Sequence, residues 1–145
     1  MRQFAQIGGQ RLPKSGGANH LVIEAALAYA RQMRLKSEIW LKAYIRRCAG
    51  AGVPAMVVHR GDSDAGIILI KVSRLDGTAD LYAPAPAGYV GDDGERTWTL
   101  IAGQKSDRDI EALLARELQL DSDSWIIEVE DRQGRAFLDG WLART

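Results

Sequence analysis

Apolar and polar residues alternate with a period of two between Pro54 and Tyr82, and this stretch has the clearest pattern in the chain. The runs are AMVVHR, IILIKVSRL and TADLY, separated by GDSDAG and by Asp76-Gly77. Asp-Gly is typical of a two-residue hairpin turn in which both residues have positive φ. The stretch therefore predicts an antiparallel meander of three strands. Its second strand is predicted to be central, because it begins apolar on both sides.

Helical periodicity flanks this stretch on both sides. After Ser37, the predicted N-cap, one apolar stripe is formed by Leu41, Tyr44, Ile45 and Cys48. After Ser106, a second N-cap, the stripe is formed by Ile110, Leu113, Leu114 and Leu118. The position of Cys48 in its stripe predicts a buried, inert thiol rather than a nucleophile.

Two further strands are expected, at Thr97–Ala102 and in WIIEVED, where Trp125, Ile127 and Val129 point inward. The segment APAPAGYVGDDGER predicts a long exposed loop. The predicted fold class is α+β: an antiparallel sheet of about five strands with two helices packed on one face, in the order α-β-β-β-β-α-β. Alternation in the strands predicts that the other face of the sheet is wetter.

Residues 1–32 differ from the rest, with four basic residues against Glu24 and several glycines near the beginning. Three interpretations stay open: a disordered lead-in with a short helix at LVIEAALAYA, an export signal ending at Ala30, or an upstream extension that is not part of the native protein. Glu24 and the glycines argue against export. The predicted division is a disordered or non-native extension at 1–32 and a single domain at 33–145, with Met33 as the natural start.

Composition limits the number of domains, the kinds of partner and the cellular location that are expected. The chain has 145 residues, enough for one domain with its own core, and 19 basic residues balance 19 acidic ones. No net field attracts nucleic acid or anionic membrane, and no apolar run reaches the roughly 20 residues of a membrane helix. The single cysteine excludes an intramolecular disulfide and favours a reducing, cytoplasmic location.

Candidate chemistry is concentrated at the first turn of the meander, where His59, Asp62 and Asp64 lie together. An imidazole and two carboxylates could hold a divalent cation. The alternative is that these residues satisfy backbone groups of an ordinary turn, and we favour it because three ligands without a fourth are a weak signal. No metal site and no cofactor are therefore predicted.

A metal-dependent, nuclease-like hydrolase is the enzyme class to test. Such a site would join Asp64 to Lys71 and Glu128 across a sheet, which extends the candidate polar cluster to His59, Asp62, Asp64, Lys71 and Glu128. Leu69 stands where an acid-x-lysine pairing would require a carboxylate. No nucleophile elbow or phosphate-binding loop is present, and the basic positions of the first helix are typical of a solvated face.

Three segments carry a family resemblance: RLKSEIWLKAYIRRC, HRGDSDAGIILIKVSRLDGTADLYAPAP and WIIEVEDRQGRAFLD. The sequence from Met33 to Leu142 resembles the bacterial family named domain of unknown function 1491 (DUF1491), whose members typically begin at a methionine corresponding to Met33. The resemblance implies no activity and no catalytic residue. The leading hypothesis is thus a small bacterial interaction or regulatory module that binds a protein partner, with the metal-dependent hydrolase as the alternative.

Overall fold

The computed structural model describes residues 6–7, 10–11, 21–22, 36–86 and 96–143. The chain divides into two compact units, Met1–Arg34 and Leu35–Thr145. In the first unit, β1 (Gln6–Ile7) pairs antiparallel with β2 (Gln10–Arg11). The predictions concerning Met33 and the stretch between Pro86 and Arg96 lie outside the described residues.

The second unit holds the elements that the periodicity predicts. They are α2 (Ser37–Gly50), β3 (Ala55–His59), β4 (Ile68–Ser73), β5 (Thr78–Pro84), β6 (Trp98–Ser106), α3 (Asp107–Leu120) and β7 (Trp125–Glu130). The order over the whole chain differs from the predicted one, because β1 and β2 come before this series and were not predicted.

The sheet is mixed, and the predicted antiparallel meander is wrong. Its strand order is β3-β7-β4-β5-β6, with β7 antiparallel to β3 but parallel to β4. The last strand therefore separates the first two strands of the stretch that was expected to be continuous. The sequence of β7 explains its position: Trp125, Ile126 and Ile127 are all buried, so this strand needs neighbours and cover on both faces. The prediction that β4 is central is confirmed.

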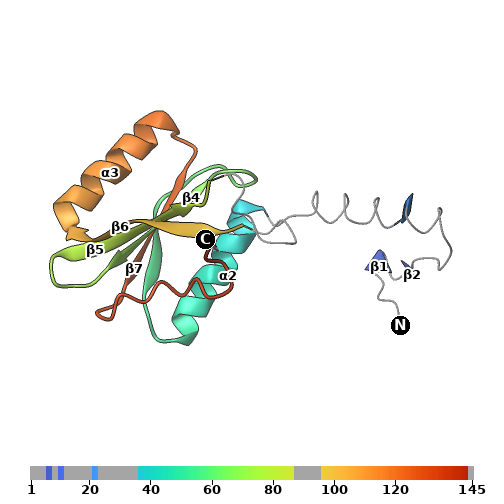
Figure 1. The fold of residues 1–145 in the computed structure, drawn as a ribbon, viewed down its shortest axis with the longest axis horizontal. Coiled ribbons are helices and arrows are strands. Elements are labelled where there is room, and N and C mark those ends of the chain that lie inside the picture. The colour runs from blue at the N-terminus through green and yellow to red at the C-terminus, as the bar shows by residue number, and fades with distance from the viewer. Residues whose placement is uncertain (1–5, 8–9, 12–20, 23–35, 87–95, 144–145) are drawn as a thin grey trace. The chain divides into compact units, whose positions relative to one another are not determined.

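The two helices cover opposite faces of the sheet, which corrects the prediction of a single covered face (Figure 1). Ile68 and Ile70 of β4 pack with residues of α2, whereas Leu69 between them packs with Ile110 and Leu114 of α3. Successive side chains of a strand point to opposite faces, so one apolar strand serves both layers. The expected wetter face is covered by α3 instead.

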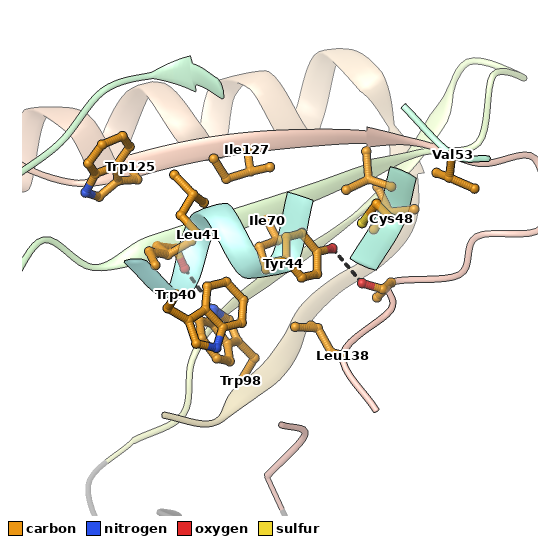
Figure 2. Packing of buried hydrophobic residues seen from close by; sticks show 14 residues of the cluster. Trp40, Leu41, Tyr44, Cys48, Val53, Ile70, Trp98, Trp125, Ile127 and Leu138 are labelled. Carbon is orange, nitrogen blue, oxygen red and sulfur yellow. Dashed lines mark hydrogen bonds between the residues drawn. The ribbon is translucent and has the colours of Figure 1, made fainter. Parts of the chain in front are cut away.

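The larger core lies between the sheet and α2. Figure 2 shows Tyr44, Leu41 and Cys48 of this helix directed at Ile70 and Ile127 of the sheet. The Tyr44 hydroxyl donates to the carbonyl oxygen of Ala136, 2.5 Å away. Burial raises the pKa of this phenol far above its ordinary value, with smaller contributions that include Cys48. The prediction that Cys48 is a core residue is confirmed.

Local turn and cap predictions are partly confirmed. Ser106 caps α3, since its Oγ accepts from the Asp109 amide at 3.1 Å. Ser37 does not cap α2, because its Oγ donates to the carbonyl of Gly66. The β4–β5 hairpin is present, but positive φ occurs at Leu75 and Gly77 rather than at Asp76. The Asp76 carboxylate instead accepts from the amide of Thr78.

Candidate functional site

Lys71 is the best-defined charged centre of the fold. It lies in register with Glu128 on parallel strands β4 and β7, and only 3% of its side chain is exposed. Its Nζ lies 2.7 Å from Asp107, 3.1 Å from Glu111 and 3.4 Å from Glu128. Asp107 and Glu111 are four residues apart in the first turns of α3, so both reach the same ammonium group. These contacts attach α3 to the sheet.

The surroundings of Lys71 keep its amine protonated. Burial acts to lower the pKa of the amine, but hydrogen bonds to Asp107 and Glu111, together with the charge of Glu128, outweigh burial and raise the pKa above its ordinary value. A nucleophilic or basic lysine needs a lowered pKa. The geometry therefore assigns Lys71 the role of a buried cation and gives no support to amine catalysis.

The turn between β3 and β4 satisfies its polar groups locally. The Nδ1 atom of His59 lies 2.9 Å from the carbonyl oxygen of Ser124. The Asp62 carboxylate accepts from the amides of Asp64 and Ala65, at 3.1 and 2.8 Å. The Asp64 carboxylate lies 3.6 Å from the ammonium group of Lys36. Each side chain thus faces a different partner, as in an ordinary turn.

Close backbone packing explains why the turn has this sequence. A Cβ atom at Gly61 or Gly66 would collide with the carbonyl oxygen of Asp123, so both positions require glycine. The indole nitrogen of Trp125 donates to the carbonyl of Asp62 at 2.7 Å. On the other side, the amides of Ser37 and Glu38 donate to carbonyls of the turn. The turn joins the start of α2 to the start of β7.

The five candidate residues separate into two groups. Lys71 and Glu128 meet on the α3 face, as the hypothesis required, but the contacts of Asp64 are with Lys36. Leu69, at the position where a nuclease would need a carboxylate, is buried in the core. Within the described parts of the chain, no group of three or more His, Cys, Asp or Glu residues could hold a metal ion.

Asp107 and Glu111 were not among the predicted site residues. The signal for them was Lys71 itself, because a lysine within an otherwise apolar strand requires carboxylate partners when it is buried. Two acids spaced by four residues at the start of a helix are suitable partners for such a cation. The sequence does not say which strand the helix covers, so the pairing could not be assigned.

Two further charged pairs, also missed, lie in the β4–β5 hairpin and in the turn after β7. The buried Asp80 carboxylate accepts hydrogen bonds from Nη2 of Arg74 at 2.8 Å and from the amide of Gln104 at 2.7 Å. Asp131, also buried, accepts from Nε and Nη2 of Arg135 at 3.0 and 2.9 Å. At both places the buried carboxylate is therefore paired with an arginine.

The pair of Asp131 and Arg135 makes a prediction about pH. The hydrogen bonds from the Arg135 side chain are the main cause of a lowered pKa of Asp131. A carboxyl group whose pKa is lowered by folding stabilises the protein at pH values above its pKa in the unfolded chain, about 3.9. That contribution disappears as the pH falls through its pKa in the folded protein. We expect Asp131→Asn to lower the urea midpoint at pH 7, and we expect its difference from wild type to shrink as the pH falls below the unfolded value of about 3.9. A difference between the two proteins that does not change with pH would contradict this assignment.

Among the described residues, β3 has the longest run of consecutive exposed apolar side chains. Three consecutive side chains are largely exposed: Met56 by 45%, Val57 by 43% and Val58 by 57%. In the part of the chain that the structure describes, β7 is the only strand that pairs with β3. We call this surface, Ala55–His59 with its free backbone groups, the β3 edge.

The opposite edge of the sheet is better protected. The start of β6 is covered by the C-terminal segment, because Trp98 exchanges hydrogen bonds with Trp141 and Ala143. The rest of β6 exposes Leu100 and Ile101, but it pairs irregularly with β5 and carries Lys105, and irregular pairing and lysine are devices that block edge-to-edge association. Of the two edges, β3 is the more open to another strand.

Sequence comparison places the chain in a family. Residues 35–139 match the family described as "Protein of unknown function (DUF1491)". The chain belongs to the DUF1491 family. The matched region contains α2, β3 to β7 and α3, so the family corresponds to the whole mixed sheet and both of its helices. The resemblance inferred from the sequence is thereby confirmed, and it carries no known role.

Solved structures of relatives agree with this membership. A DUF1491 family protein from Caulobacter crescentus CB15 is 40% identical, with a TM-score of 0.62, and the match covers 72% of this chain and 94% of that one. Protein Atu0922 from A. tumefaciens is 39% identical, with a TM-score of 0.60, and the match covers 67% of this chain and 86% of that one. Their names state no ligand, substrate or partner.

Two further comparisons bear on this DUF1491 chain. No curated protein matches it. In the described segments, neither helix has the length and apolar character needed to span a bilayer.

Proposed function

We propose that this DUF1491 protein is an interaction module that binds a partner protein through the β3 edge. The observation that carries the proposal is the run of three exposed apolar side chains on a strand whose outer side has no partner in the described structure. Exposed edges invite pairing with another chain, and natural proteins usually protect them with charges, prolines or bulges. Here the protection is limited to Pro54 before the strand and a bulge near Val58.

The backbone of β3 offers hydrogen bonds to an added strand. The Glu130 amide donates to the carbonyl of Pro54, and Met56 lies opposite Glu128 two residues further along. Hydrogen-bonded pairs alternate in an antiparallel ladder, so Met56 bonds toward β7. Ala55 and Val57 therefore direct their N–H and C=O groups away from the sheet, where an extended peptide can pair with them.

A bacterial cytoplasmic setting is part of the proposal. The relatives come from Caulobacter crescentus and A. tumefaciens, and the single cysteine, Cys48, is a free thiol in the core. A protein without disulfides is suited to a reducing compartment. We also retain the proposal of a domain at 33–145 with a natural start at Met33; intact-mass measurement of the untagged native protein would test it.

Val57→Pro tests the proposed binding edge. Proline removes the outward N–H of residue 57 while leaving the bonds of Met56 to β7, and edge strands tolerate proline where the missing N–H faces solvent. The wild-type chain should capture a partner protein from lysate of its own organism. We expect Val57→Pro to capture at least about tenfold less of it, because the variant lacks the N–H donor and its proline ring blocks the approach of an added strand.

Val57→Thr is the matched control, because it keeps the N–H group and the β-branched shape. It should capture the same protein as wild type. Thermal unfolding of all three proteins establishes that the variants are folded. Equal capture by folded Val57→Pro and wild type would show that the β3 edge is not the binding surface.

A further inference from the structure

The side of α2 that lies along β3 is defined by four residues. Glu38, Lys42, Ile45 and Ala49 form one stripe at helical spacing. At one end of β3, Glu38 accepts from Arg60 at 3.0 Å. At the other end, the Val53 amide donates to the carbonyl of Cys48, next to Ala49. The opposite side of the helix, with Arg47, contacts the C-terminal segment at Phe137. The stripe therefore follows the β3 edge.

Among the described residues, Lys42 carries the unpaired charge of this stripe. It is exposed near the middle of the stripe, and in residues 36–86 and 96–143 no carboxylate lies within ion-pair distance of it. Glu38 is already engaged by Arg60. Val57 lies opposite Ile127, a residue of the α2-side core, so its side chain is on the same face as Lys42. Met56 points to the other face, opposite Glu128.

These positions specify the chemistry of an added strand. We propose, as an extension of the proposed function, that the β3 edge binds an extended segment of another protein in which acidic and apolar side chains alternate. Its carboxylates lie on the α2 face, within reach of Lys42. Its apolar side chains lie on the opposite face, against Met56. Backbone hydrogen bonds pair the added strand with β3. The alternation of its side chains decides which face of the strand meets α2 and which peptide sequences bind best.

A second copy of this chain is a poorer occupant of the same edge. Antiparallel pairing of two β3 strands about Val57 would bring Lys42 of each copy toward the same two-fold axis. The strand itself, AMVVH, contains no acidic residue that could meet this lysine. Like charges brought together in this way oppose association.

Peptide binding to the full chain tests the preference. The probes are two fluorescent peptides of about seven residues, long enough to pair with the whole of β3: one alternates valine with glutamate, the other valine with lysine. We expect the acidic peptide to bind about two- to fivefold more tightly, the effect of one exposed ion pair, and added salt to reduce the difference. Lys42→Glu should reverse the preference, whereas Lys105→Glu, on the opposite edge strand, should leave it unchanged.

The outcomes separate the two proposals. If Val57→Pro abolishes binding of both peptides but Lys42→Glu changes neither affinity, the β3 edge binds strands and the acidic preference is wrong. If folded Val57→Pro binds as wild type does, both proposals are wrong. A dimer seen by light scattering at micromolar concentration that Val57→Pro converts to monomer would assign the edge to a second copy and overturn the proposal of a foreign partner.

Discussion

Trp98→Ala is expected to lower the free energy of unfolding by about 3–5 kcal/mol, the usual cost of removing a buried aromatic side chain. Trp98 is 1% exposed, and its ring stacks on that of Trp40 with 4.2 Å between centroids (Figure 2). Its indole nitrogen also donates to the carbonyl of Ile68 at 2.9 Å. The substitution removes the packing and leaves a buried acceptor without its donor. Urea denaturation should show a lower midpoint with an unchanged slope.

Trp98→Phe separates the two contributions. Phenylalanine retains an aromatic ring against Trp40 but cannot donate to Ile68, so the expected loss is smaller, about 1–2 kcal/mol. Leu75→Ala is a surface control, since this side chain is largely exposed, and should change the midpoint little. A loss below about 1 kcal/mol in Trp98→Ala would mean that the layer beside α2 repacks easily and that its aromatic stack contributes little.

Local pattern predicted the elements of this fold but not all of their neighbours. The stripes of α2 and α3 and the alternation in β4 follow from periods that each segment shows by itself. The position of β7 between β3 and β4 depends on pairing residues that are distant in sequence. The clue to it was the consecutive burial-prone run of Trp125, Ile126 and Ile127, which is typical of a strand covered on both faces. Two covered faces would also have required the helices to lie on opposite sides.

The candidate site was predictable to a similar extent. The hydrolase alternative placed Asp64, Lys71 and Glu128 together across the sheet; Lys71 and Glu128 lie 3.4 Å apart, whereas Asp64 contacts Lys36. Asp107 and Glu111 could not be included, because periodicity does not say which strand their helix covers, and the helix was predicted to lie on the same face as α2. His59, Asp62 and Asp64 are close in sequence, yet each is satisfied by a backbone group or by Lys36. These three side chains are therefore close in sequence but do not converge on one ligand site.

The apolar run that forms the β3 edge is visible in the sequence, but its exposure at the edge of the sheet is not. Met56, Val57 and Val58 are consecutive apolar residues, which in a strand places at least one of them on each face. The period-two pattern predicted β4 as the neighbour of this strand within a meander. In the structure β7 takes that neighbouring place, and the outer side of β3 is left open among the described residues. Exposure of an edge depends on strand order, which periodicity does not determine.

Lys71→Glu should be among the most destabilising charge substitutions in the protein. It would place a fourth carboxylate among Asp107, Glu111 and Glu128 at a position that is 3% exposed. We expect a loss of about 3 kcal/mol, the lower end of the range for breaking a buried ion pair, because Asp107 and Glu111 are half-exposed and stay hydrated. Lys71→Met fills a similar volume without charge and should cost about 1 kcal/mol.

The pH dependence of these variants tests the same arrangement. The pKa of Lys71 is raised, so its contribution is fully present below the unfolded value, about 10.4, and is lost as the pH rises through the folded value. The gap between wild type and Lys71→Met should therefore be constant from about pH 6 to 9 and narrow above about pH 10. Lys71→Glu should instead recover stability below about pH 5, where protonation of carboxylates relieves their repulsion. Equal losses for the two variants at every pH would show that the aliphatic stem of Lys71, rather than its charge, holds α3 against the sheet.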